Sequence, residues 1–75
     1  MITFNGKEYN NRHGGPFDRG SADSWYSRSI DPHYYVGDTG SSVRLELVDM
    51  SEKEVQDYLA GYAWNEEFGG KKEWD

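Results

Sequence analysis

The chain has 75 residues, no cysteine, and 14 acidic against 8 basic side chains, which gives a formal net charge of −6. This size limits it to one domain, and the absence of cysteine excludes a disulfide framework and a thiolate zinc site. Aromatic side chains make up 16% of the residues. Because Ile, Leu and Val are scarce, we expect a small core that is built largely from rings.

Several other classes of protein are excluded by the same composition. The apolar runs are too short to cross a membrane or to form the core of a signal peptide. His13 and His33 are the only imidazoles and lie in different segments, and no calcium-type acidic loop occurs. We therefore expect no metal, no cofactor and no membrane contact.

The first residues predict a β-hairpin with short strands near 2–4 and 7–9. Asn5-Gly6 between these strands is the strongest two-residue signal for a type I′ turn, because both central positions need a positive φ. The Asn- and Gly-rich residues that follow, up to Pro16, predict a loop.

A short helix is expected near 19–28. Ala22, Trp25 and Tyr26 recur at the i, i+3, i+4 spacing of one helix face, and Asp18 precedes them as a candidate N-cap. The Ser and Gly residues in this stretch lower its helix propensity.

Two further strands are predicted near 33–36 and 43–47. The first follows Pro32, which disfavours helix at the residue before it. The second alternates apolar and charged residues, as a half-buried strand does, and its apolar face is Val43, Leu45 and Leu47. The residues between these strands, which include the turn-like Asp38-Thr39-Gly40, predict a loop.

The last helix, near 52–67, has the clearest signals. Ser51 and Glu54 have the spacing of a capping box. One apolar stripe runs along the helix, and Gly69-Gly70 ends it. The stripe consists of Val55, Tyr58, Leu59 and Tyr62.

These elements predict an α+β fold. The N-terminal hairpin and the strand near 43–47, joined by the strand near 33–36, form a small antiparallel sheet. The last helix packs its apolar stripe on this sheet, and the short helix covers an edge. Residues 1–70 make a single small domain, and residues 71–75 a C-terminal tail that Trp74 folds back onto the body.

Trp64 lies on the opposite side of the last helix from the apolar stripe, beside the small residues Ala60 and Gly61. We expect other groups to shield a tryptophan ring in this position from water. The sequence leaves three covers open: another segment of the chain, such as Trp25, Trp74 or the hairpin; a second copy in a homodimer; or a target protein.

The densest group of polar and aromatic residues lies between positions 15 and 34. Its side chains form either internal salt bridges and a ring cluster or a binding face, since Arg, Tyr and Trp dominate interface hot spots. The acidic last helix offers either a second binding face or only solubility. The candidate binding residues are Asp18, Arg19, Asp23, Trp25, Tyr26, Arg28, His33, Tyr34, Asp57 and Trp64. No catalytic arrangement is found among them.

Three strings carry a resemblance to a known group of proteins. They are Gly-Gly-Pro-Phe-Asp-Arg-Gly-Ser-Ala-Asp-Ser-Trp-Tyr-Ser-Arg followed by Pro32-His33-Tyr34, then Tyr58-x-x-Gly61-Tyr62-x-x-Asn65-Glu66, and the ending Lys72-Glu73-Trp74. Together they resemble small proteins encoded by tailed bacteriophages. The resemblance implies a small accessory protein that acts in the cytoplasm of the bacterial host, and it implies no particular reaction.

A second pattern is similar to the helix–linker–helix family of ribosome modulation factor. It consists of Arg19-Gly-x-Ala-Asp, a later Pro32, and Tyr58-x-x-Gly61-Tyr62. That family is basic and binds ribosomal RNA, whereas this chain is acidic.

The leading functional hypothesis is a non-enzymatic, phage-encoded accessory protein that binds and modulates or inhibits a host protein. A defence or nucleic-acid-processing factor with a basic surface fits the acidic and aromatic composition. One alternative is a nucleic-acid or ribosome binder that uses Arg19, Tyr26 and Arg28. Another is a small-ligand, for example nucleotide, binder that uses Asp18, Asp23 and His33.

Overall fold

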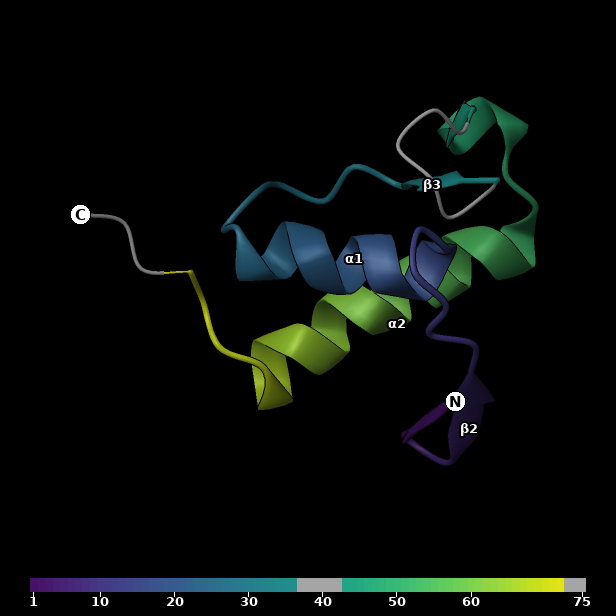
Figure 1. The fold of residues 1–75 in the computed structure, drawn as a ribbon. Coiled ribbons are helices and arrows are strands. Elements are labelled where there is room, and N and C mark those ends of the chain that lie inside the picture. The colour runs from purple at the N-terminus through teal and green to yellow at the C-terminus, as the bar shows by residue number, and fades with distance from the viewer. Residues whose placement is uncertain (37–42, 73–75) are drawn as a thin grey trace.

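The structure is a computed structural model that describes residues 1–36 and 43–72. The expected loop with Asp38-Thr39-Gly40 and the expected contact of Trp74 lie outside these residues. The elements in chain order are β1 (Ile2–Phe4), β2 (Lys7–Tyr9), α1 (Pro16–Trp25), β3 (His33–Tyr35), β4 (Arg44–Glu46), the 3-10 helix η1 (Leu47–Asp49) and α2 (Glu52–Phe68) (Figure 1). The predicted α+β class is confirmed.

The N-terminal hairpin forms as predicted. β1 and β2 pair antiparallel in the register Ile2↔Tyr9 and Phe4↔Lys7. Asn5 and Gly6 have φ angles of 52° and 79°, which are the two positive values that a type I′ turn requires.

Helix α1 begins and ends three residues earlier than the sequence predicted. Pro16 occupies its first turn, where a missing N–H has no cost, and Gly15 is the N-cap. Asp18 is therefore not the N-cap. It lies inside the first turn, and its Oδ2 accepts a hydrogen bond from the Gly14 N–H at 2.9 Å. The helix ends at Trp25, and Ser27 has a left-handed φ of 59°.

The two helices run in the same direction and pack directly on each other, with the segment between α1 and β3 returning along the outside of α1 (Figure 1). Their backbones meet at Gly20 and Gly61. An added Cβ at Gly20 would overlap the Tyr58 carbonyl oxygen, and one at Gly61 would overlap the Phe17 carbonyl oxygen. The expected packing of α2 on a sheet is wrong, because α1 occupies this place.

The start of α2 matches its prediction closely. The Ser51 side chain accepts from the Glu54 N–H, and the Glu54 carboxylate accepts from the Ser51 N–H, which completes the capping box. The helix ends at Phe68, one residue beyond the expected end, and Gly69 is its C-cap.

The described strands form two separate two-stranded sheets, β1-β2 and β3-β4, instead of one. In the second sheet, Leu45 is half-buried opposite Tyr34, whereas Val43 and Leu47 are exposed. The apolar face predicted for residues 43–47 is therefore reduced to Leu45, because the chain turns into η1 at Leu47 and leaves the strand.

Rings from the hairpin and both helices build the apolar core below the helix pair. Phe4, Tyr9 and Phe17 are buried, and Ile2, Ala60 and Trp64 pack against them; we call these six residues the apolar cluster. The rings of Tyr9 and Phe17 stack at 5.3 Å, and those of Phe17 and Trp64 lie 5.8 Å apart. The prediction that the core is built from rings is confirmed.

Candidate binding site

A buried polar cluster lies on the other side of the helix pair, between the helices and β3. Its centre is the Asp23 carboxylate of α1, which is 4% exposed. The fully buried Tyr58 of α2 donates its hydroxyl proton to Asp23 Oδ2 and accepts from the Asp31 N–H at 3.1 Å. Burial, and then the hydrogen bond to Asp23, raise the pKa of Tyr58 far above its ordinary value, so this hydroxyl remains a donor.

His33 closes the buried polar cluster from β3. Its Nδ1 lies 2.7 Å from the Asp31 carbonyl oxygen and 3.7 Å from Asp23 Oδ2. A carbonyl oxygen only accepts, so Nδ1 carries a proton and donates it to Asp31. The backbone of the segment before β3 thus determines which tautomer the neutral ring adopts.

Strand pairing adds an arginine beside this cluster. In the β3-β4 register, His33 faces Glu46 and Tyr35 faces Arg44, so these four side chains share one side of the two-stranded sheet. Arg44 donates from Nε to Glu46 at 2.7 Å and from Nη2 to Asp31 at 3.1 Å. The hydrogen bond to Glu46 raises the pKa of Arg44 above its ordinary value.

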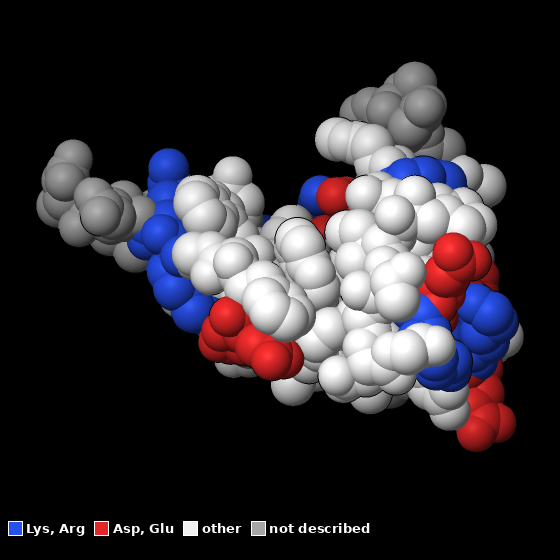
Figure 2. Space-filling view, turned by 90° about the horizontal axis from the view of Figure 1, so that it is seen from below, with Lys and Arg blue, Asp and Glu red and all other residues white. Residues whose placement is uncertain are grey.

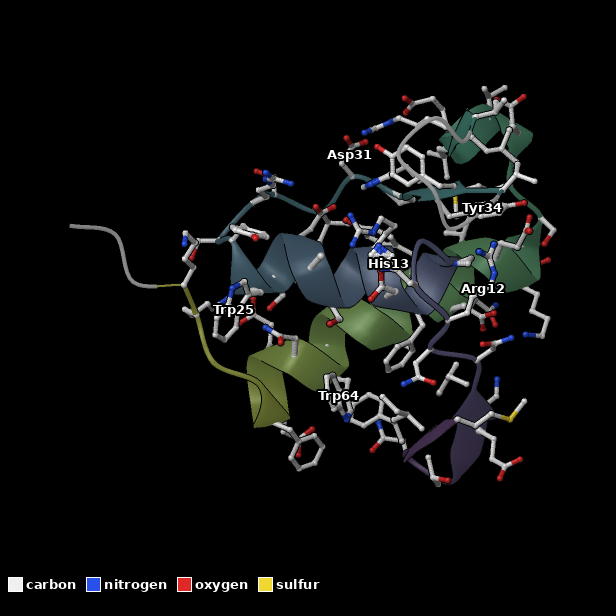
Figure 3. All side chains as sticks on the ribbon, viewed as in Figure 1. Arg12, His13, Trp25, Asp31, Tyr34 and Trp64 are labelled. Carbon is white, nitrogen blue, oxygen red and sulfur yellow. The ribbon has the colours of Figure 1, made fainter. Side chains whose placement is uncertain are left out.

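These groups surround an open pocket of about 290 Å³, which we call the arginine pocket. In Figure 3, Asp31 marks its place on the upper side of α1, near β3. Helix α1, the segment after it, β3 and β4 all contribute to the wall. The lining residues are Arg19, Asp23, Arg28, Ser29, Asp31, His33, Tyr35 and Arg44.

Four of the residues singled out in the sequence meet in this pocket: Arg19, Asp23, Arg28 and His33. Asp18 borders it, because its Oδ2 accepts from Arg19 Nη2 at 2.9 Å. The internal salt bridges that the sequence left open are present, since Arg28 also faces Asp23 across 3.6 Å. The same residues therefore form both a salt-bridge network and the wall of a pocket.

The other sequence candidates around α1 and β3 do not line the pocket, although the Tyr26 ring lies 4.9 Å from the Arg28 guanidinium. Trp25 and Tyr26 are at the far end of α1, as the Trp25 label in Figure 3 shows. The Lys72 N–H bonds to the Trp25 carbonyl oxygen at 2.7 Å, so the first residues of the expected C-terminal tail contact α1. Tyr34 is on the opposite side of β3 from His33, where a hydrogen bond with Glu54 raises its pKa.

Trp64, expected on a bare side of α2, is half-buried in the apolar cluster. Figure 3 shows it below α2, toward the hairpin. The hairpin and α1 thus supply the cover that the sequence analysis left open. The ring still contributes to the surface beside Phe68, whose centroid lies 6.5 Å away.

The acidic side chains of α2 have partners within the chain. Asp57 accepts from Lys53 Nζ at 2.9 Å, and Glu66 accepts from Lys71 Nζ at 2.7 Å. The bond from Lys71 lowers the pKa of Glu66 below its ordinary value. Glu54 belongs to the capping box. Two of the carboxylates that suggested an acidic docking helix, Asp57 and Glu66, are therefore neutralised by neighbouring lysines.

Sequence reasoning missed several residues of the pocket and the buried polar cluster. Tyr35 and Arg44 reach the pocket through the register of β3 and β4, and Asp31 reaches it from the segment before β3. Tyr58 was assigned to the apolar stripe, yet its hydroxyl completes the contact with Asp23, 35 positions away in the chain. The polar side chains that make these contacts can be seen in the sequence. Their neighbours in the chain do not indicate which distant residue each one contacts.

Comparisons of the chain with protein families, with curated proteins and with solved structures find no match. Among the described residues, no helix is both long enough and apolar enough to cross a membrane. In the same part of the chain, no three acidic or imidazole side chains gather as metal ligands would. The site must therefore be interpreted from its own geometry.

Proposed function

We propose that the chain is a non-enzymatic accessory protein that binds a host protein in the bacterial cytoplasm and modulates or inhibits it. The observation that carries this proposal is an exposed aromatic surface at the end of α2, next to the hairpin. We call it the aromatic face and define it as Trp64 and Phe68, whose ring centroids lie 6.5 Å apart. The resemblance to small bacteriophage proteins supports the setting.

The aromatic face is anchored to the apolar cluster but remains open to solvent. Phe68 is 64% exposed, whereas Trp64 is half-buried and packs within the apolar cluster. The Phe68 ring stands edge-on to Phe4 at 6.0 Å and lies near Trp64, so the core holds it in place. A pre-positioned ring binds a partner with little loss of side-chain entropy.

The distribution of charged residues also supports the aromatic face as a binding surface. Figure 2 shows mainly uncharged residues across the centre of the face seen from below, with acidic and basic side chains gathered toward its two ends. Depletion of charged residues at the centre of a surface is typical of protein interfaces. Glu67, next to Phe68, places an acidic group at the edge of the aromatic face, which suits a partner whose surface is basic around an apolar site.

The test is capture of partners from a bacterial lysate with the tagged full chain and with two matched variants. Phe68→Ser removes the exposed ring of the aromatic face, and Val48→Ser removes an even more exposed apolar side chain on η1. We expect one dominant protein partner, a loss of capture of about tenfold or more with Phe68→Ser, and no loss with Val48→Ser. Thermal melts check that both variants fold.

Three results would overturn the proposal. The first is equal capture by the wild type and Phe68→Ser. The second is recovery of RNA alone, with loss of all signal after nuclease treatment, which would favour the nucleic-acid alternative. The third is a homodimer in light scattering that Phe68→Ser dissociates, because a second copy would then occupy the aromatic face.

A further inference from the structure

We propose that the arginine pocket binds a phosphate group, either as inorganic phosphate or as the phosphate monoester of a small molecule. This site is separate from the aromatic face, and the inference does not depend on the proposed function. It begins from the convergence of three of the chain's four arginines on one pocket, although they are as far apart in sequence as Arg19 and Arg44.

Guanidinium groups are concentrated in the wall of the pocket. Arg19, Arg28 and Arg44 line it against the carboxylates of Asp23 and Asp31. Two further carboxylates, those of Asp18 and Glu46, bond Arg19 and Arg44 from outside the lining. Guanidinium groups suit phosphate because their planar fork places two N–H donors against two anionic oxygens.

The arginines retain donors for a ligand. Arg19 directs both Nε and Nη2 at one oxygen of Asp18, which leaves its Nη1 group outside that bond. The Arg28 side chain is 63% exposed, and its 3.6 Å separation from Asp23 exceeds a hydrogen-bond distance. Its guanidinium also stacks 4.9 Å above the Tyr26 ring, which restricts its position without using its N–H groups.

The two carboxylates in the wall already have partners within the chain. Asp23 Oδ2 accepts from Tyr58, and Asp31 Oδ2 accepts from Arg44, so each has an oxygen already bonded within the chain. Ser29 and Tyr35 add hydroxyl groups to the lining. A volume of about 290 Å³ accommodates a phosphate group with a small organic substituent.

The experiment is a titration of the isotope-labelled full chain, followed by NMR chemical shifts, at low salt. The probes are inorganic phosphate, adenosine monophosphate, and adenosine as the uncharged control. We expect saturable shifts at the lining residues with both phosphate probes and none with adenosine. Tighter binding of adenosine monophosphate than of phosphate would assign the site to a monoester, and equal binding would assign it to phosphate itself.

Two variants with the same loss of charge decide whether the pocket is responsible. Arg28→Gln removes the most exposed guanidinium of the wall, and Lys7→Gln removes a cation from the distant hairpin. We expect Arg28→Gln to weaken binding about tenfold and Lys7→Gln to change it less than about twofold. Thermal melts report the folding of both. Absence of saturable shifts, equal binding of adenosine, or equal weakening by the two variants would overturn the proposal.

Discussion

The two sides of the helix pair are held together by different physics. Below the crossing of α1 and α2, the apolar cluster joins the helices to the hairpin through stacked rings. Above it, the buried polar cluster joins the helices to β3 through Asp23, Tyr58 and His33. Both sides depend on the same close approach at Gly20 and Gly61.

The difference lies in how each side tolerates change. Apolar contacts are non-directional and their contribution scales with buried area, so neighbouring rings adjust when one is altered. A buried carboxylate requires its particular donors, because a missing one leaves a charge that neither water nor protein solvates. We therefore expect conservative substitutions to give different losses in the free energy of unfolding on the two sides. Truncation of whole side chains should distinguish the two sides less clearly.

The largest effect should come from the shared crossing. Gly61→Ala places a Cβ onto the Phe17 carbonyl oxygen, and backbone on both sides prevents relief by a rotamer change. We expect a loss of about 3 kcal/mol or more in the free energy of unfolding, measured by chemical denaturation. The control Ala63→Gly, at an exposed position of α2, should cost only about 1 kcal/mol. An unchanged or increased stability of Gly61→Ala, which is what helix propensity alone predicts, would contradict the role of Gly61 in close packing.

The next effect compares one chemical change on the two sides. Tyr58→Phe removes the hydroxyl between Asp23 and the Asp31 N–H, and we expect it to destabilise the fold by about 2–3 kcal/mol. Tyr9→Phe keeps the ring that stacks on Phe17 and should cost less than about 0.5 kcal/mol. Denaturant titrations of both variants give the comparison. Similar losses would mean that the two sides do not differ as described.

A smaller effect is expected at the second buried polar contact of the helix pair. Asn65 Nδ2 donates to Ser24 Oγ at 2.9 Å and to the Gly70 carbonyl oxygen at 3.0 Å. Asn65→Ala should cost about 1–2 kcal/mol. The double variant with Ser24→Ala should cost less than the sum of the two single changes, because both remove one interaction. Strict additivity in the double-mutant cycle would contradict the contact.

The smallest effect is a pH dependence at the link between β3 and α2. The Ser51 N–H, and then the Tyr34 hydroxyl, lower the pKa of Glu54 below its ordinary value of 4.5. A lowered pKa in the folded state contributes stability above the ordinary value, and this contribution is lost as the pH falls through the folded value. Glu54→Gln should remove this part of the acid sensitivity in unfolding titrations across acidic pH. Parallel pH profiles for both proteins would contradict the link.

Half of the candidate site could be predicted from the sequence. Charged and aromatic residues are dense between positions 15 and 34, and this density identified four candidates: Arg19, Asp23, Arg28 and His33. Arg44 could not be identified in this way, because it reaches Asp31 only after β3 and β4 pair. Trp64 was placed on an exposed side of α2 because helical spacing alone does not show which side another helix covers.

Glycine illustrates the same limit for the fold. In the sequence, Gly20 and Gly61 count as weak points of two helices, since glycine lowers helix propensity. In the structure, they are the positions at which the backbones touch. Local sequence patterns likewise cannot predict that the strands pair into two sheets, because the pattern of one strand does not specify which other strand it pairs with.

The sequence by itself determined the α+β class, the Asn5-Gly6 turn and the capping box of Ser51 and Glu54. Each of these features depends on backbone preferences and side chains within a few positions of each other, so the local sequence contains the whole cause. Only the tertiary structure decided the helix crossing, the burial of Trp64, the contact of Tyr58 with Asp23 and the arginine pocket. These features arise from groups distant in the chain, whose contact depends on how the elements pack.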